Sequence, residues 1–414
     1  MRHRARGLFA GLLAAISAAC GGDGGGGAAT TPVQAFTGGP ISPLGSVMPL
    51  DLATGYFDGD ARRDLVLPGG IAFTLNGMQL GAGVFLSDSD GSLSAKAPVT
   101  MGLPDMSGEI YRALSGHFRV WAHEDVLVVS SREYGVLLGN GDGTFDPEWS
   151  VGRVFQNPIV ALDAEIYHTN SNFLDDFVVG TTQGSVATYG CMGAGVFQLL
   201  DLFVVAPGTA IIDVVAAYLD GDEIEDVVAL DSASGIHVLF GDGGGSFTVG
   251  PSLVGGLPGE ARGILLGRFD NAPGLDLAVM RVSSATPTPH ASVLVVTGDG
   301  TGGFGVLTGE VDLRQGEFGY DGGGAQGEVV LLSELNSLVV AAGPSAPGSD
   351  RFLFLVRTDG AGVPSAERIP HPGSVATIRA SDMDGDWLTD LAVVYEGETL
   401  LDFTIQVLYA TLPR

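Results

Sequence analysis

Only two cysteines, Cys20 and Cys191, occur among the 414 residues, so a disulfide framework is excluded as the source of stability. Basic residues are also scarce. Lys96 is the only lysine, and 19 lysines and arginines stand against 48 acidic residues, for a net charge of −29. Because phosphate binding needs a basic surface, this balance excludes nucleic acid as an ordinary partner and disfavours anionic membrane surfaces.

The motifs of common catalytic sites are missing as well. There is no H-E-x-x-H and no G-x-S-x-G, so neither zinc-peptidase nor α/β-hydrolase chemistry is indicated. G-D-G-T-G-G from Gly298 matches a dinucleotide-binding fingerprint, but no helical pattern follows it. Cys191 has no activating neighbours and is interpreted as a buried or loop thiol. We interpret His117, His123 and His168 as solvated loop residues.

The N-terminal segment has the features of an export signal. In residues 1–19 three arginines precede an apolar stretch, Leu8 to Ala19, that is too short to span a bilayer. The run I-S-A-A-C resembles a bacterial lipobox, which predicts lipidation of Cys20, and residues 20–33 form a glycine-rich tether. Ser17 replaces the usual leucine, so ordinary cleavage after Ala19 stays open. We expect a cell-envelope lipoprotein (outer membrane or cell surface) that meets the membrane only through its lipid, or otherwise a secreted protein.

An acidic loop followed by an apolar strand is the most informative stretch of the chain. It reads S-D-M-D-G-D-W-L-T-D-L-A-V-V from Ser381, with Asp382, Asp384, Asp386 and Asp390 at positions 1, 3, 5 and 9. Four carboxylates this close repel one another, and calcium, which takes about six to eight oxygen ligands, would neutralise them. The backbone carbonyl of Leu388, at position 7, falls into the same shell. An EF-hand is excluded, because Trp387 stands where that loop needs glycine.

Weaker copies of this loop recur, so the chain is predicted to contain seven repeats of about 50 residues. In six of them an aspartate ends the loop and begins an apolar run: Asp64, Asp125, Asp176, Asp226, Asp276 and Asp390. The seventh copy is S-L-V-V-A-A-G from Ser337, behind a shortened loop. The runs do not alternate, as expected for strands buried on both faces. A small residue such as Gly55 or Gly267 precedes most loops, which we attribute to crowding near a central axis.

A glycine-rich hairpin turn follows each loop, as in L-G-N-G-D-G-T-F from Leu138 and F-G-D-G-G-G-S-F from Phe240. With these motifs, residues 34–414 resemble the FG-GAP or VCBS repeat family, whose repeats build the propeller of integrin alpha subunits and many bacterial surface proteins. The resemblance implies an all-β fold, a seven-bladed β-propeller of four-stranded blades with calcium in the loop between the first two strands.

Carried over by position, the resemblance implies a complete ligand set only in the last loop, Asp382 to Asp390. Two further loops keep acids at positions 3, 5 and 9, with a backbone carbonyl at position 7. They are Asp58, Asp60, Arg62 and Asp64, and Asp220, Asp222, Ile224 and Asp226. The remaining loops keep fewer acids: Asp270 and Asp276, Asp125 alone, and Asp176 with Asn170 and Asn172. Metal in the last two is doubtful.

The two ends of the chain are predicted to complete one blade. The last repeat stops at F-T-I-Q-V-L-Y-A without its outer strand, and F-T-G-G-P from Phe36 matches F-T-V-G-P from Phe247. Residues 34 to about 42 are therefore expected to form the outer strand of the last blade, which leaves only short edges.

Three functions remain open. The first is a calcium-stabilised, envelope-tethered binding module for a protein or glycan partner, acting as a monomer. The second is a polysaccharide-degrading, lyase-like enzyme on the same scaffold, which would need a cluster of Arg, Tyr, His or Lys at one mouth of the channel. The third is a structural envelope component. A fold alone does not decide among them.

Overall fold

A computed structural model describes residues 35–411, and the described residues form one compact unit. Gaps in the description fall at residues 46, 75–76, 101–109, 120–122, 154–160, 170–172, 254–256, 258, 284–289, 314–325, 333–334, 343–350 and 398–401. The predicted signal peptide, the tether with Cys20, Asn170 and Asn172 lie outside the described residues.

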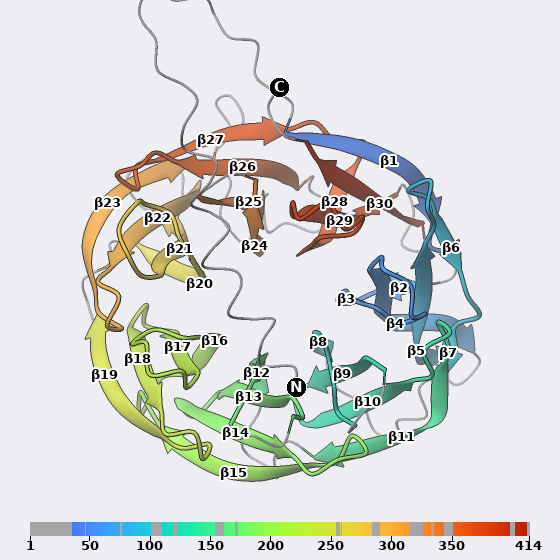
Figure 1. Ribbon diagram of the computed structural model, residues 1–414, viewed down its shortest axis with the longest axis horizontal. Helices are drawn as coiled ribbons and strands as arrows, with labels where there is room; N and C mark the ends of the chain where they lie inside the picture. The colour runs from blue at the N-terminus through green and yellow to red at the C-terminus, as the bar shows by residue number, and fades with distance from the viewer. Residues whose placement is uncertain are drawn as a thin grey trace, which may run out of the picture. The chain divides into compact units, whose positions relative to one another are not determined.

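Seven antiparallel sheets stand around a common centre, and their strands run from the inside outward (Figure 1). We number the sheets as blades 1 to 7 in chain order, from the blade that contains β4 to the blade that contains β28. The innermost strands are β3 (Ala53–Gly55), β8 (Ile110–Gly116), β12 (Ala161–Tyr167), β16 (Ile211–Ala217), β20 (Glu260–Gly267), β24 (Gln326–Leu331) and β28 (Ser374–Ser381). The second strands are β4 (Asp64–Thr74), β9 (Asp125–Ser130), β13 (Asp176–Thr181), β17 (Asp226–Asp231), β21 (Asp276–Ser283), β25 (Asn336–Ala342) and β29 (Asp390–Glu396).

The third strands are β5 (Gly77–Ser87), β10 (Glu133–Gly139), β14 (Ser185–Cys191), β18 (Ile236–Gly241), β22 (His290–Gly298), β26 (Phe352–Thr358) and β30 (Phe403–Ala410). The outer strands are β11 (Phe145–Arg153), β15 (Phe197–Val204), β19 (Phe247–Leu253), β23 (Phe304–Asp312), β27 (Pro364–Ile369) and β1 (Phe36–Pro43). Blade 1 adds β2 (Met48–Pro49), which pairs with β4 further along the strand than β3 does. Two short strands, β6 (Leu93–Ala95) and β7 (Val99–Thr100), share its outer position.

The innermost strands follow one another around the centre, and β28 returns to β3. The protein is therefore a seven-bladed β-propeller, as predicted. β1 pairs with β30 from Phe36 opposite Ala410 to Pro43 opposite Thr404, so the N-terminal strand closes the last blade, also as predicted (Figure 1). The described part of the chain has no helix long and apolar enough to cross a membrane.

The core is divided into layers between successive blades. Each cluster of buried apolar side chains in the described residues takes its members from two neighbouring blades. The layer that closes the ring joins Leu52 and Leu65 of blade 1 to Ala392 and Val394 of blade 7. Second strands such as β9, β13 and β17 are buried along their whole length, since both of their faces meet a neighbour.

The small residues before the loops have a different cause from the one we predicted. A Cβ on Gly55 would meet the ring of Phe57 and the carboxylate of Glu124 from the next blade. Gly116 stands in the same relation to Phe118 and Asp175. The space is therefore limited by the loop itself and by the neighbouring blade rather than by the axis.

Candidate metal centre and the loop face

The loops between the first and second strands form the loop face. These are residues 56–63, 117–124, 168–175, 218–225, 268–275, 332–335 and 382–389. Since all blades share one strand order, the loops emerge on the same side of the ring. Successive loops are joined by hydrogen bonds, such as Tyr56 N–H to Glu124 Oε2 at 2.9 Å and His117 N–H to Asp175 Oδ2 at 2.7 Å.

In six blades the aspartate that follows the loop, at position 9, holds the loop closed by accepting backbone N–H groups, and we call it the bracket aspartate. Asp390 accepts the N–H of Met383 at 2.8 Å and the N–H of Ala410, at the end of β30, at 2.7 Å. Asp226 does the same with Leu219 and Gly241. All six of these aspartates are buried: Asp64, Asp125, Asp176, Asp226, Asp276 and Asp390. Sequence reasoning assigned Asp64, Asp226 and Asp390 to metal and missed this shared role of all six, although an aspartate at the same place in every long loop was the signal for it.

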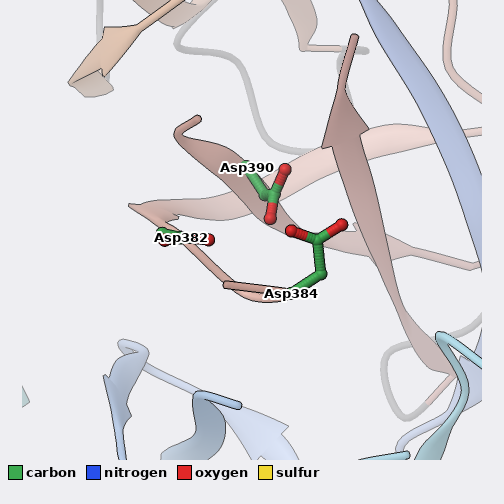
Figure 2. A group of neighbouring side chains, drawn as sticks. All are labelled: Asp382, Asp384 and Asp390. Carbon is green, nitrogen blue, oxygen red and sulfur yellow. The ribbon is translucent and has the colours of Figure 1, made fainter. Parts of the chain in front are cut away.

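Blade 7 brings three of its four predicted acidic ligands together. One oxygen each from Asp382, Asp384 and Asp390 lies within 4.8 Å of the others, the only such trio among the described residues. Figure 2 shows the carboxylates of Asp384 and Asp390 facing each other. The fourth acid, Asp386, is outside this trio and accepts the N–H of Leu388 at 2.8 Å.

Burial and repulsion between its carboxylates disfavour the fully ionised state of this loop. Burial raises the pKa of Asp390 to about 7, and the charges of Asp384 and Asp386 add to that shift. The pKa of Asp384 is raised too, first by burial and then by Asp386. The backbone is already folded around the acids, because Asp382 accepts the N–H of Gly385 at 2.8 Å and that of Trp387 at 3.2 Å.

The weaker candidate loops are folded in the same way, but among the described residues their carboxylates do not form a trio like that of blade 7. In blade 4, Asp220 accepts the N–H of Asp222 at 3.1 Å, and Asp222 accepts that of Ile224 at 2.9 Å. In blade 1, Asp58 accepts the N–H of Asp60 at 3.0 Å. Asp60 in turn accepts the N–H of Arg62 at 2.7 Å and pairs with its guanidinium.

Blade 3 uses a histidine where metal was doubtful. His168 Nε2 lies 2.7 Å from Asp175, and its Nδ1 lies 2.9 Å from Glu225 of blade 4. These hydrogen bonds raise the pKa of His168 to about 10, so the ring is an imidazolium that bridges two blades. Our interpretation of His168 as a solvated loop residue was therefore wrong.

Two large aromatic side chains stand out on the loop face. Phe173 and Trp387 are 77% and 73% exposed, and both are the sixth residue of their loop. Their φ angles are +63° and +73°, in the left-handed region that favours glycine. Glu223 has the same conformation at the sixth position of blade 4. The loop geometry imposes this strain, and two blades keep a bulky exposed ring there in spite of it.

Near the axis, charged side chains from six blades form a second polar group, the axial cluster. Arg112 pairs with Asp163 and lies 3.7 Å from Asp213, while Arg379 lies 3.2 Å from Asp51 and 3.5 Å from Glu328. Glu165 belongs to the same cluster, and burial raises its pKa to about 7. Three of the acids also bind the next blade, since Asp51, Asp163 and Asp213 accept the N–H groups of Ala113, Val214 and Ile264.

No family model and no curated protein matches this chain. Among solved structures, it is similar to a chain in the crystal structure of BBS1N in complex with ARL6DN, with a TM-score of 0.59 and 11% identity over 92% of this chain and 98% of that one. A lectin of Agrocybe aegerita that recognises non-reducing terminal N-acetylglucosamine gives 0.52 and 13%, over 86% and 93%. A protein from Lactobacillus plantarum gives 0.51 and 12%, over 83% and 91%. At these identities the likeness establishes the propeller fold and nothing finer.

Proposed function

We propose that this protein is a calcium-stabilised propeller that binds a protein or glycan partner through its loop face. It would be held at the cell envelope by a lipid on Cys20, as the lipobox-like sequence indicates. The observation that carries the proposal is the blade 7 loop. It places a convergent carboxylate trio beside an exposed tryptophan on one face of a closed ring.

The donor set of this loop fits calcium. Carboxylate oxygens are the hard ligands that calcium prefers, and Asp382, Asp384 and Asp390 supply them from one short segment. Asp386 and the carbonyl of Leu388 would complete the shell, as the repeat-family resemblance implies. Asp220, Asp222 and Asp226 form the second candidate, with the carbonyl of Ile224. Burial, and then repulsion between the aspartates, raise the pKa values of Asp384 and Asp390, and a bound divalent cation would offset both effects.

The partner surface is inferred from exposure. Water-exposed aromatic rings on strained backbone are costly to keep unless they contact something. Phe173 and Trp387 meet that description. Two of the similar structures are named for binding, one in complex with ARL6DN and the other as a lectin, which supports a binding role for this scaffold.

The lyase-like alternative gains no comparable support. Such an enzyme needs cationic groups free to neutralise a uronate carboxylate. In the described residues, both axial arginines are already engaged, Arg112 with two aspartates and Arg379 with Asp51 and Glu328.

Calcium dependence is tested by thermal unfolding of residues 34–414 in excess calcium and in chelator. A ligand at a hundred times its dissociation constant adds about 2.7 kcal/mol, which corresponds to about 3 °C for a domain of this size. We expect at least that shift in the native protein and a smaller one in Asp384→Asn, which keeps only the blade 4 candidate. An unchanged melting temperature in the native protein refutes structural calcium.

Partner binding is tested on a glycan array and against purified envelope proteins. The native protein is compared with the double variant Phe173→Ala, Trp387→Ala, which should keep its melting temperature and lose binding. Retained binding by the double variant would show that the loop face is not the partner surface.

A further inference from the structure

The bracket aspartates differ in what they hold besides two backbone N–H groups. In blades 4 and 7, Asp226 and Asp390 accept only those two bonds from the residues that the structure describes. In blade 3, Asp176 also accepts the hydroxyl of Thr169, and in blades 1 and 5 Asp64 and Asp276 accept a third N–H, from Asp58 and Asp270. Among the described residues, spare acceptor capacity is thus found in the bracket aspartates of blades 4 and 7 and not in that of blade 1, although the blade 1 loop is as acidic as that of blade 4.

In blade 2 the additional donor to the bracket aspartate is an arginine. The guanidinium of Arg119 donates through Nη2 to Asp125 Oδ1 at 2.7 Å and to the carbonyl of Gly139 at 2.6 Å, and its Nε lies 3.4 Å from Asp125 Oδ2. One cation therefore contacts both oxygens of a fully buried carboxylate and a carbonyl at the end of the third strand. That is an all-oxygen environment of the kind a metal ion would occupy.

Arg119 occupies the same loop position as Asp384. Both are the third residue of their loop, and both loops close on a bracket that binds the N–H of the second residue, Phe118 or Met383. The charge balance also corresponds. Blade 2 has a single bracket carboxylate with one guanidinium, whereas blade 7 has four loop carboxylates that require a cation of higher charge.

Blade 1 is intermediate. Arg62 pairs with Asp60 and donates from Nε to the carbonyl of Ser87 at 3.0 Å, so its fifth-position acid already has a cation. In blade 4, Glu225 pairs with His168. Among the described residues, the candidate metal-binding aspartates of the blade 4 and blade 7 loops form no ion pair with a basic side chain: Asp220, Asp222, Asp226, Asp382, Asp384, Asp386 and Asp390.

We propose that Arg119 is a built-in replacement for a divalent cation in blade 2, and that Arg62 serves blade 1 in the same way. Divalent ions are then confined to the loops of blades 7 and 4. The confinement rests on the proposed calcium role, whereas the replacement by arginine does not. Each long loop is then closed either by a donor of the protein itself, such as a hydroxyl, an N–H group or a guanidinium, or by a bound metal ion.

The test transplants the blade 2 solution into blade 7. In chelator, Asp384→Arg should melt at a higher temperature than Asp384→Asn, because the new guanidinium reaches Asp390 as Arg119 reaches Asp125. In both variants the calcium response of blade 7 should be lost, which leaves only what the blade 4 loop contributes. If Asp384→Arg melts no higher than Asp384→Asn, the replacement idea is overturned.

The reverse variant removes the built-in cation. Arg119→Gln should lower the melting temperature by about 5 °C, equally in calcium and in chelator, because a buried carboxylate loses its charged partner. Arg132→Gln, at an exposed arginine for which no ion pair is found among the described residues, is the matched control and should change nothing. An unchanged melting temperature for Arg119→Gln would contradict the proposal.

The two proposals fail in different ways. Absence of any calcium shift in the native protein removes the calcium role but leaves both arginine comparisons decisive, since each is made in chelator. A calcium shift that survives in Asp384→Asn and disappears in Asp58→Asn would instead place the metal in blade 1. That result would contradict the proposal that Arg62 replaces a divalent cation there.

Discussion

Replacing Arg112 with methionine should destabilise the ring more than any exposed charge change, and more strongly at alkaline pH. Arg112 is 28% exposed, whereas its partner Asp163 is only 5% exposed. Asp213 depends on the same guanidinium, and burial followed by the nearby Asp163 charge raises the pKa of Asp213 well above its usual value. The methionine side chain preserves packing but leaves these buried carboxylates without a counter-charge.

The size of the effect follows from that burial. Removing one partner of a buried ion pair costs about 3–5 kcal/mol. For a domain of this length the entropy of unfolding is on the order of 0.8 kcal/mol per kelvin, so the melting temperature should fall by about 5 °C. Arg262→Met is the control. Arg262 and Glu260 are 43% and 58% exposed, and such a pair contributes at most about 1 kcal/mol.

The sign of the pH dependence is fixed by the raised pKa values. A carboxyl whose pKa is higher in the folded state destabilises the fold fully above the folded pKa and not at all below the unfolded one. For Glu165 that window runs from the ordinary glutamate pKa of 4.5 to about 7. The deficit of Arg112→Met should therefore shrink between about pH 8 and pH 5. Equal deficits at both pH values, or a deficit no larger than that of Arg262→Met, would refute the reasoning.

Three further outcomes are expected. Trp387→Gly should raise the free energy of unfolding by about 1 kcal/mol in urea titrations, because glycine accepts a φ of +73° and the replaced residue is 73% exposed. A decrease would show that the ring packs on the loop. Deletion of residues 36–43 should give an aggregated product by size-exclusion chromatography, since β30 then lacks its partner, and a soluble folded monomer would argue against closure by β1. Cys20→Ala should abolish incorporation of labelled palmitate in cells, and unchanged labelling would exclude Cys20 as the lipid site.

The regular part of the fold was predictable because each blade repeats its burial pattern. The six bracket aspartates begin the second strands of their blades, as their sequence pattern indicated, and Asn336 begins the seventh. The likeness of Phe36 to Phe247 identified β1 as an outer strand, since both start one and both are buried. Blade 1 departs from the pattern. Pro98, which has no N–H, separates β6 from β7.

Contacts between blades were not predictable from loop motifs alone. Arg119 and His168 occur in loops that looked degenerate, yet each supplies a cation to a carboxylate. The axial cluster left a trace in the sequence, because Asp51, Arg112, Asp163 and Asp213 precede their bracket aspartates by the same interval. Which charge meets which depends on how the ring closes, as Arg379 of blade 7 meets Asp51 of blade 1.

The bracket aspartate explains how one propeller can contain loops that differ so much in acidity. Its two N–H bonds close the loop whether or not other acids are present, as Asp125 shows in a loop with no other metal-type aspartate. The acids at positions 1, 3 and 5 are then free to vary without loss of the strand order. Metal at Asp382, Asp384 and Asp390 would add rigidity to a loop that is already folded, so calcium should govern how firmly the loop face holds Trp387 rather than whether the blades form.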